Sequence, residues 1–241
     1  MRVESAPIVR KVKDIEYRLL PGTARRTTDI VIERDGCITV RPPARMTPDQ
    51  VDQTVLSRRH WIYRNLAEWR DLNAVRVVRE WVNGESFLYL GSAYRLRLVE
   101  NQDAPLKLKG GRFNLSRRIV DAGGSAAAQR AFRDFYIARG VERLTQRLAY
   151  FAPRVGVRPG PLAVKELGFR WASATRSGVV QFHWKCLMAP PKVLDYIVVH
   201  ELCHLRHADH TDLFWNEVDK VMPDYRERRE WLRSRGAALT L

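Results

Sequence analysis

Residues 198–215 read VVHELCHLRHADHTDLFW, and the rest of the chain is organised around this stretch. It holds four of the six histidines in the 241-residue sequence. His200 and His204 are four residues apart, so on an α-helix they lie one above the other on the same face. Both imidazoles can then reach a single ion at about 2.0–2.1 Å, the usual length of a zinc–nitrogen bond. The pattern therefore predicts a zinc site on a helix.

Glu201 follows the first of these histidines directly. Its carboxylate is expected to lie beside the metal rather than on it. From there it can take a proton from a water molecule on the metal and later pass that proton to a leaving group. A structural zinc site normally fills all four positions with protein ligands and has no use for such an acid. We therefore expect Glu201 to act as a general base.

A catalytic zinc ion needs three protein ligands and one open position, so a third ligand must come from outside this helical turn. His207 would share the face of His204 if the helix continued, but three ligands along one straight helix do not converge on a point. A turn after His204 would bring His210 back over the metal, and Asp209 tolerates the left-handed conformation that such a turn can need. We favour His210 and keep His207, or a residue elsewhere, as the alternatives.

The context of the motif supports a metal site over a chance match. An apolar run at residues 197–199 leads into the motif, and the further histidine follows at a workable spacing. Cys203 also lies within the motif. Its position on the helix turns the side chain mostly away from the metal, so we expect it to pack in the core.

The segment APPKVLDYIVVHELCHL, residues 189–205, resembles the YgjP-like metallopeptidases, which are relatives of the SprT-like zincins. The resemblance extends to His210 and to Phe214-Trp215, and upstream to residues 170–173 and to Trp184-Lys185. It is strong over residues 169–215 and weaker towards the N-terminus. The resemblance implies a zincin-like catalytic domain with Glu201 as the general base and with three zinc ligands, His200, His204 and His210.

The sequence departs from this family pattern at a few positions. Ala172 replaces a usual glycine and Ala174 a usual cysteine, while His183 and Asp209 stand where asparagine is common. These departures leave the ligands intact but affect the hairpin that would face the substrate. The spacing of the third histidine also equals that of metzincins, but His207 occupies the position of their turn glycine, so we reject that assignment.

Composition indicates a globular protein with enough apolar residues, 45%, for a proper core. No stretch approaches the roughly 20 apolar residues of a membrane span, and the N-terminus has no apolar signal core. The three cysteines, Cys37, Cys186 and Cys203, are too few and too scattered for a disulfide framework. We therefore expect a cytoplasmic protein without membrane contact.

The net charge of +15 is large for a chain of this size and attracts anionic partners such as nucleic acid, nucleotides or acidic substrates. Arginine pairs are spread along the chain, without the interleaved aromatic residues that single-strand binders use. The sequence therefore leaves two interpretations open, a general arginine-rich surface and a dedicated anion-binding face. The pairs include Arg25-Arg26, Arg58-Arg59 and Arg117-Arg118.

Residues 1–122 predict a small β-rich module with one long helix. Asp35-Gly36 between two β-rich runs is a hairpin signal. Thr47-Pro48 predicts the start of a helix that continues to about Arg70, with threonine as the N-cap and proline in the first position. The predicted strands are residues 8–20, 29–33, 37–41, 86–90, 94–99, 106–109 and 112–115.

Residues 121–125 resemble a linker, and we place the boundary of the zincin-like domain, residues 126–241, after it. Apolar residues at helical spacing predict a supporting helix over residues 126–151. Strands are expected at residues 162–167 and 179–184, and a metal-binding helix from Lys192. The hairpin before that helix can hold an extended peptide by main-chain pairing. Arg170 and His183, near this hairpin, are candidates for contacting an oxyanion or an anionic group of the substrate.

The fold class expected is thus α+β, with the zincin-like domain preceded by the β-rich module. The leading hypothesis is a zinc-dependent hydrolase, most simply a peptidase. A second hypothesis keeps the metal and changes the substrate to a nucleotide or another phosphoester, which the basic charge would attract. The third hypothesis is a module that has a non-catalytic metal site and binds nucleic acid through its basic surface.

Overall fold

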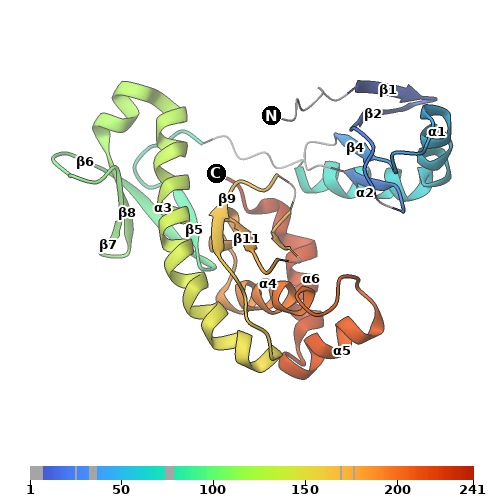
Figure 1. The fold of residues 1–241 in the computed structure, drawn as a ribbon. Helices are drawn as coiled ribbons and strands as arrows, with labels where there is room; N and C mark the ends of the chain where they lie inside the picture. Colours follow the sequence, from blue (N-terminus) through green and yellow to red (C-terminus); the bar gives the residue numbers. More distant parts are fainter. Residues whose placement is uncertain (1–7, 25, 33–36, 74–78, 169, 176) are drawn as a thin grey trace. The chain divides into compact units, whose positions relative to one another are not determined.

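The structure is a computed structural model. The chain forms two compact units, Met1–Arg76 and Val77–Leu241, each with its own hydrophobic core (Figure 1). Both units combine helices and strands, which confirms the expected α+β class. In the described part of the chain, no helix has the length and apolar composition needed to cross a membrane. The described residues are 8–24, 26–32, 37–73, 79–168, 170–175 and 177–241.

The N-terminal unit contains a four-stranded sheet in the order β1-β2-β4-β3. Residues 8–20, expected as one extended segment, form a hairpin instead, because Lys13 adopts a left-handed φ of 53° and reverses the chain. The predicted antiparallel pairing of β3 with β4 is confirmed, while the turn signal Asp35-Gly36 lies outside the described residues. The strands are β1 Ile8–Val12, β2 Ile15–Leu19, β3 Asp29–Ile32 and β4 Ile38–Arg41.

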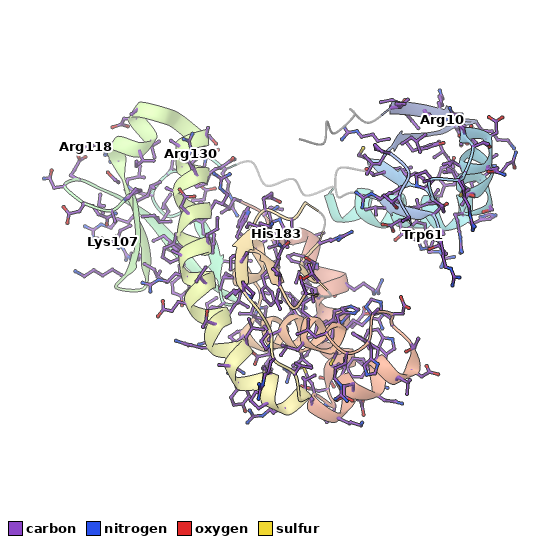
Figure 2. All side chains as sticks on the ribbon, in the orientation of Figure 1. Arg10, Trp61, Lys107, Arg118, Arg130 and His183 are labelled. Atoms are coloured by element: carbon purple, nitrogen blue, oxygen red, sulfur yellow. The ribbon has the colours of Figure 1, made fainter. Side chains whose placement is uncertain are left out.

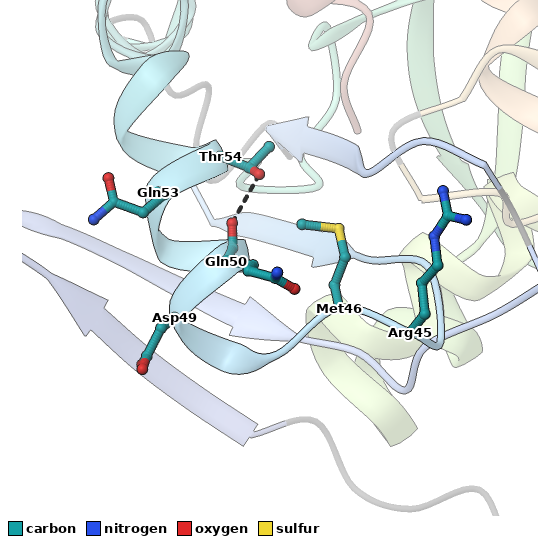
Figure 3. Close-up of a pocket in the computed structure, with 6 residues that line it drawn as sticks. All are labelled: Arg45, Met46, Asp49, Gln50, Gln53 and Thr54. Carbon is teal, nitrogen blue, oxygen red and sulfur yellow. Dashed lines mark hydrogen bonds between the residues drawn. The ribbon is translucent and has the colours of Figure 1, made fainter.

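Two helices follow this sheet where one was expected. Helix α1, Pro48–Ser57, begins with the predicted cap, in which the Thr47 hydroxyl accepts from the Gln50 N–H and the Gln50 side chain accepts from the Thr47 N–H. The helical path breaks at Arg58, and α2 covers Arg59–Asn73. A hollow of about 540 Å³ beside α1 is shown in Figure 3. It is lined by Arg45, Met46, Asp49, Gln50, Gln53 and Thr54.

The C-terminal unit begins with a second four-stranded sheet, in the order β5-β6-β8-β7, which packs against the long helix α3, Arg117–Val155 (Figure 1). Aromatic rings join the two, since the Phe132 ring centroid lies 4.3 Å from that of Phe87 and 4.9 Å from that of Phe113. These contacts bury one face of the sheet. The strands, near the predicted positions, are β5 Ser86–Tyr89, β6 Ser92–Val99, β7 Leu106–Lys109 and β8 Arg112–Ser116.

The boundary between the units lies earlier than the sequence suggested. Residues 121–125, expected as a linker, belong to α3, and only Gly124 departs from helical geometry, with φ 56° and ψ −150°. The glycines therefore mark a kink within the helix. Because the β5–β8 sheet shares one core with α3, this sheet belongs to the C-terminal unit, and the division falls at Arg76–Val77.

A three-stranded sheet completes the C-terminal unit, with β10, Ala172–Ala174, at one edge. Next to it lies β11, Val180–His183, which pairs in parallel with β9, Leu162–Lys165. Helix α4 packs against α3, α5, α6 and β10, and Figure 1 shows it below β11. The helices are α4 Pro191–His204, α5 Asp212–Val221 and α6 Tyr225–Arg235, with short 3₁₀ turns η1 Trp184–Met188 and η2 Gly236–Ala238.

Candidate metal centre

Helix α4 carries the two histidines and the glutamate of the motif, as predicted. It begins with Pro191 in the first turn, where the missing N–H costs nothing, and most of its residues are buried. The Arg147 guanidinium on α3 donates two hydrogen bonds to the Asp195 carboxylate on α4, at 2.6 and 2.9 Å. This ion pair ties α4 to α3, and α4 places Nε2 of His204 3.2 Å from Nε2 of His200.

The chain turns after α4 and brings a third histidine to this pair. His210 Nε2 lies 3.0 Å from His200 Nε2 and 3.2 Å from His204 Nε2. The turn does not need the left-handed conformation that Asp209 would tolerate, because Asp209 is not among the residues with positive φ. Its carbonyl instead accepts a hydrogen bond from the Thr211 N–H at 2.9 Å, immediately before α5.

His207, the rival third ligand, is not a member of this cluster. Its contribution comes from the main chain, since its carbonyl oxygen lies 3.1 Å from Nδ1 of His204. A carbonyl only accepts, so His204 Nδ1 carries the proton and its Nε2 presents a lone pair to the other two histidines. Metal-binding histidines are typically oriented by a hydrogen bond of this kind.

The cluster fits a zinc ion in geometry and in protonation. Nitrogens about 2.0–2.1 Å from a common tetrahedral centre stand roughly 3.3–3.4 Å apart, close to the 3.0–3.2 Å found here. Burial, followed by the neighbouring His204, lowers the pKa of His200 to about 3, and burial also lowers the pKa values of His204 and His210. Neutral imidazole is the form that binds metal.

Aromatic side chains of α5 and α6 hold the third histidine in place. Trp215 stacks on His210 with ring centroids 5.5 Å apart and an interplanar angle of 24°, and Tyr225 stacks on Trp215 at 5.3 Å. The Phe214 ring lies 4.6 Å from that of His204. The position of His210 therefore depends on the packing of helices that follow it in the sequence.

Arg229 is a residue of this site that the sequence did not single out. Its guanidinium lies 4.6 Å from the Trp215 ring centroid, and its positive charge helps to lower the pKa values of His200 and His210. In the sequence it is one arginine of a basic helix, which is typical of a solvated face. Only the packing of α6 brings it beside the histidines.

Glu201 lies inside the protein next to the cluster, with 6% of its surface exposed. Burial raises the pKa of its carboxyl to about 8, and two effects oppose this rise, a hydrogen bond from the Ala174 N–H on β10 and the charge of Arg170. The N–H of Ala174 was not predicted, because a main-chain donor leaves no sequence signal. Cys203 is buried in the core as expected, and burial raises the pKa of its thiol to about 12.

The two predicted substrate contacts differ in their surroundings. Arg170 is exposed, and its charge acts on Glu201. His183 is buried, with Nε2 2.6 Å from a carboxylate oxygen of Glu166, while its Nδ1 accepts from the Lys185 N–H at 3.1 Å. The Nδ1 contact assigns the ring proton to Nε2, so both ring nitrogens are engaged within the protein. A substrate would have to displace one of these partners to reach His183.

Comparison with known proteins gives the family. A sequence model described as the YgjP-like metallopeptidase domain matches residues 26–235. The crystal structure of the metallopeptidase zymogen abylysin from Pyrococcus abyssi is 26% identical, with a TM-score of 0.34, and the match covers 36% of this chain and 89% of that chain. No curated protein matches the chain. Since the family match spans most of the sequence, the chain belongs to the YgjP-like metallopeptidase domain family.

Proposed function

We propose that the protein is a zinc-dependent peptidase of the zincin type, with His200, His204 and His210 as the metal ligands and Glu201 as the general base. The observation that carries the proposal is the convergence of the three Nε2 atoms, 3.0–3.2 Å apart, next to the buried carboxyl of Glu201. Three histidines leave a fourth tetrahedral position for a reacting group, which is typical of catalytic rather than structural zinc.

Zinc in this site would supply Lewis acidity, which makes a bound water more acidic and polarises the scissile carbonyl. The task of Glu201 is to take the proton of the attacking water and to return it to the leaving amine. The N–H of Ala174 orients the carboxyl. The positive charge of Arg170 favours the ionised carboxylate of Glu201 and opposes the effect of burial. It therefore limits the rise of the Glu201 pKa and keeps it closer to the range in which a carboxyl exchanges protons near neutral pH.

The edge strand β10 supports a peptide as the substrate. Within the described residues β10 pairs on one side only, with β11, so its other edge can pair with an extended chain. Ala174 links this strand to Glu201. We assign Arg170, which precedes the strand, to an anionic or carbonyl group of the bound peptide, because it is exposed and its charge acts on Glu201.

The test compares the wild-type protein with Glu201→Gln after zinc loading. Elemental analysis should give about one zinc per chain in both, because Glu201 is not a ligand. Cleavage of casein and of an unstructured peptide library should fall at least about 100-fold in the variant, as expected for loss of a general base.

Glu227→Gln serves as the matched control, since it removes an exposed glutamate on α6, and it should retain full activity. A nucleoside triphosphate panel is measured in parallel. Cleavage of these nucleotides without peptide cleavage would replace the peptidase assignment with phosphoester hydrolysis. Undiminished peptide cleavage by Glu201→Gln would overturn the role of Glu201.

A further inference from the structure

The β5–β8 sheet has one face buried against α3 and one face in solvent. Side chains alternate along each strand, so Phe87, Leu96 and Phe113 point into the core. The residues between them point outwards, and Figure 2 shows Lys107 on the side of the sheet away from α3. The exposed cations of this outer face are Arg95, Arg97, Lys107, Lys109 and Arg112, which together we call the basic sheet face.

Strand register places these cations in rows. Arg95 on β6 is opposite Arg112 on β8, and Arg112 is opposite Lys109 on β7. In the next row Arg97 and Lys107 flank Asn114. Neighbouring strands are about 4.8 Å apart, and alternate residues of one strand about 6.7 Å apart. Five positive charges therefore share a small area of sheet.

Nothing in the described part of the chain neutralises them. The four strands contain no acidic residue. None of the five side chains forms an ion pair with another described residue, whereas several exposed arginines elsewhere do, such as Arg139 with Glu142 and Arg226 with Asp219. Like charges directly opposite each other destabilise a sheet. A general arginine-rich surface does not explain a face that lacks acids altogether, so the charges point to an anionic partner.

We propose that the basic sheet face binds the phosphate backbone of double-stranded nucleic acid without sequence preference. A duplex carries one negative charge per roughly 1.7 Å of its axis, dense enough to engage cations at this spacing. The outward positions of the strands carry no aromatic side chain on which an unpaired base could stack, which disfavours single strands. Contacts to phosphates alone position a duplex but do not discriminate between sequences.

Fluorescence anisotropy with a labelled 20-base-pair duplex of arbitrary sequence tests this proposal across a series of KCl concentrations. If all five cations contact phosphates, the slope of log K against log[KCl] should be about −4.5. In the triple variant Arg95→Gln, Lys107→Gln, Arg112→Gln the slope should become shallower, about −2. The affinity of this variant at 0.1 M KCl should be at least about tenfold lower than that of the wild type. A shuffled duplex should bind equally well.

The control variant Arg130→Gln, Arg133→Gln, Arg154→Gln removes the same net charge from exposed positions of α3 in the same unit and should bind like the wild type. His204→Ala should also bind normally, because the basic sheet face does not depend on the metal site. Equal weakening by the sheet and α3 variants would overturn the proposal in favour of a diffuse field. Binding to phosphatidylserine vesicles or to an acidic polypeptide, but not to the duplex, would overturn it as well.

Discussion

The Nε2 atom of His210 lies 3.0 Å from that of His200, although the two are ten positions apart in the sequence. The turn that follows α4 brings His210 to His200, and stacking of His210 on Trp215 holds it there. The hydrogen bond at His204 Nδ1 makes its Nε2 a lone-pair donor, and a metal ion can accept this lone pair together with those of the two neighbouring imidazoles. The arrangement is thus one that a metal ion stabilises.

The third ligand can be identified by metal content. His210→Ala should lose zinc during dialysis against a weak chelator, because two histidines alone do not hold a catalytic ion. His207→Ala should retain about one zinc per chain, since only the main-chain carbonyl of His207 contacts His204. Elemental analysis of the two variants beside the wild type checks this, and zinc retained by His210→Ala would exclude it as a ligand.

The stability of the metal-free protein should depend on pH through Glu201. Its pKa is about 8 in the folded protein, compared with an ordinary value of 4.5. Between these values the folded state binds more protons than the unfolded state, so the contribution of Glu201 to stability is present at low pH and is lost as the pH rises to 8. The cost is at most about 1.4 kcal/mol per pH unit.

This dependence can be isolated by comparing the wild type with Glu201→Gln in urea denaturation with EDTA between pH 5 and pH 8. Glutamine does not ionise, so the variant should gain stability relative to the wild type as the pH rises. A difference in unfolding free energy that does not change with pH would show that the carboxyl ionises normally.

Glu166 should be important for stability although much of it is exposed. Its two oxygens accept hydrogen bonds from His183 Nε2 at 2.6 Å and from the Trp184 indole at 2.9 Å. Glu166→Ala would remove the carboxylate that accepts from both buried donors, at a cost of about 1–3 kcal/mol for each donor that water does not reach. Urea denaturation should show this loss, whereas Glu230→Ala, which removes an exposed ion pair with Arg233, should change stability by less than about 1 kcal/mol.

Removing a charge from the basic sheet face should stabilise the protein. Arg112 lies opposite both Arg95 and Lys109, and like charges directly opposite each other destabilise a sheet. Arg112→Thr introduces a residue that favours strands and should raise the midpoint of urea denaturation. Arg117→Gln removes a paired arginine, whose partner Glu100 is 2.9 Å away, and should not have this effect. A lower midpoint for Arg112→Thr would indicate that the arginine supports the sheet.

Local signals predicted several elements well. The threonine cap before Pro48 and the apolar spacing of α3 act within a few residues, so they are readable in the sequence. The helix break at Arg58 was missed, because no glycine or proline marks it. Residues 121–125 were wrongly assigned to a linker, because glycines also occur at kinks within packed helices.

Helical periodicity in the sequence was enough to place His200 and His204 on one face of a helix that also carries Glu201, because an α-helix brings residues four apart together. The position of His210 beside His200 and His204, with His207 outside the cluster, comes from the tertiary structure, since it depends on how α5 and α6 pack against α4. The tertiary structure likewise places the Ala174 N–H beside Glu201 and sets the cations of the β5–β8 sheet in rows. Main-chain donors and strand register are set by contacts between residues distant in the chain, and no local pattern encodes them.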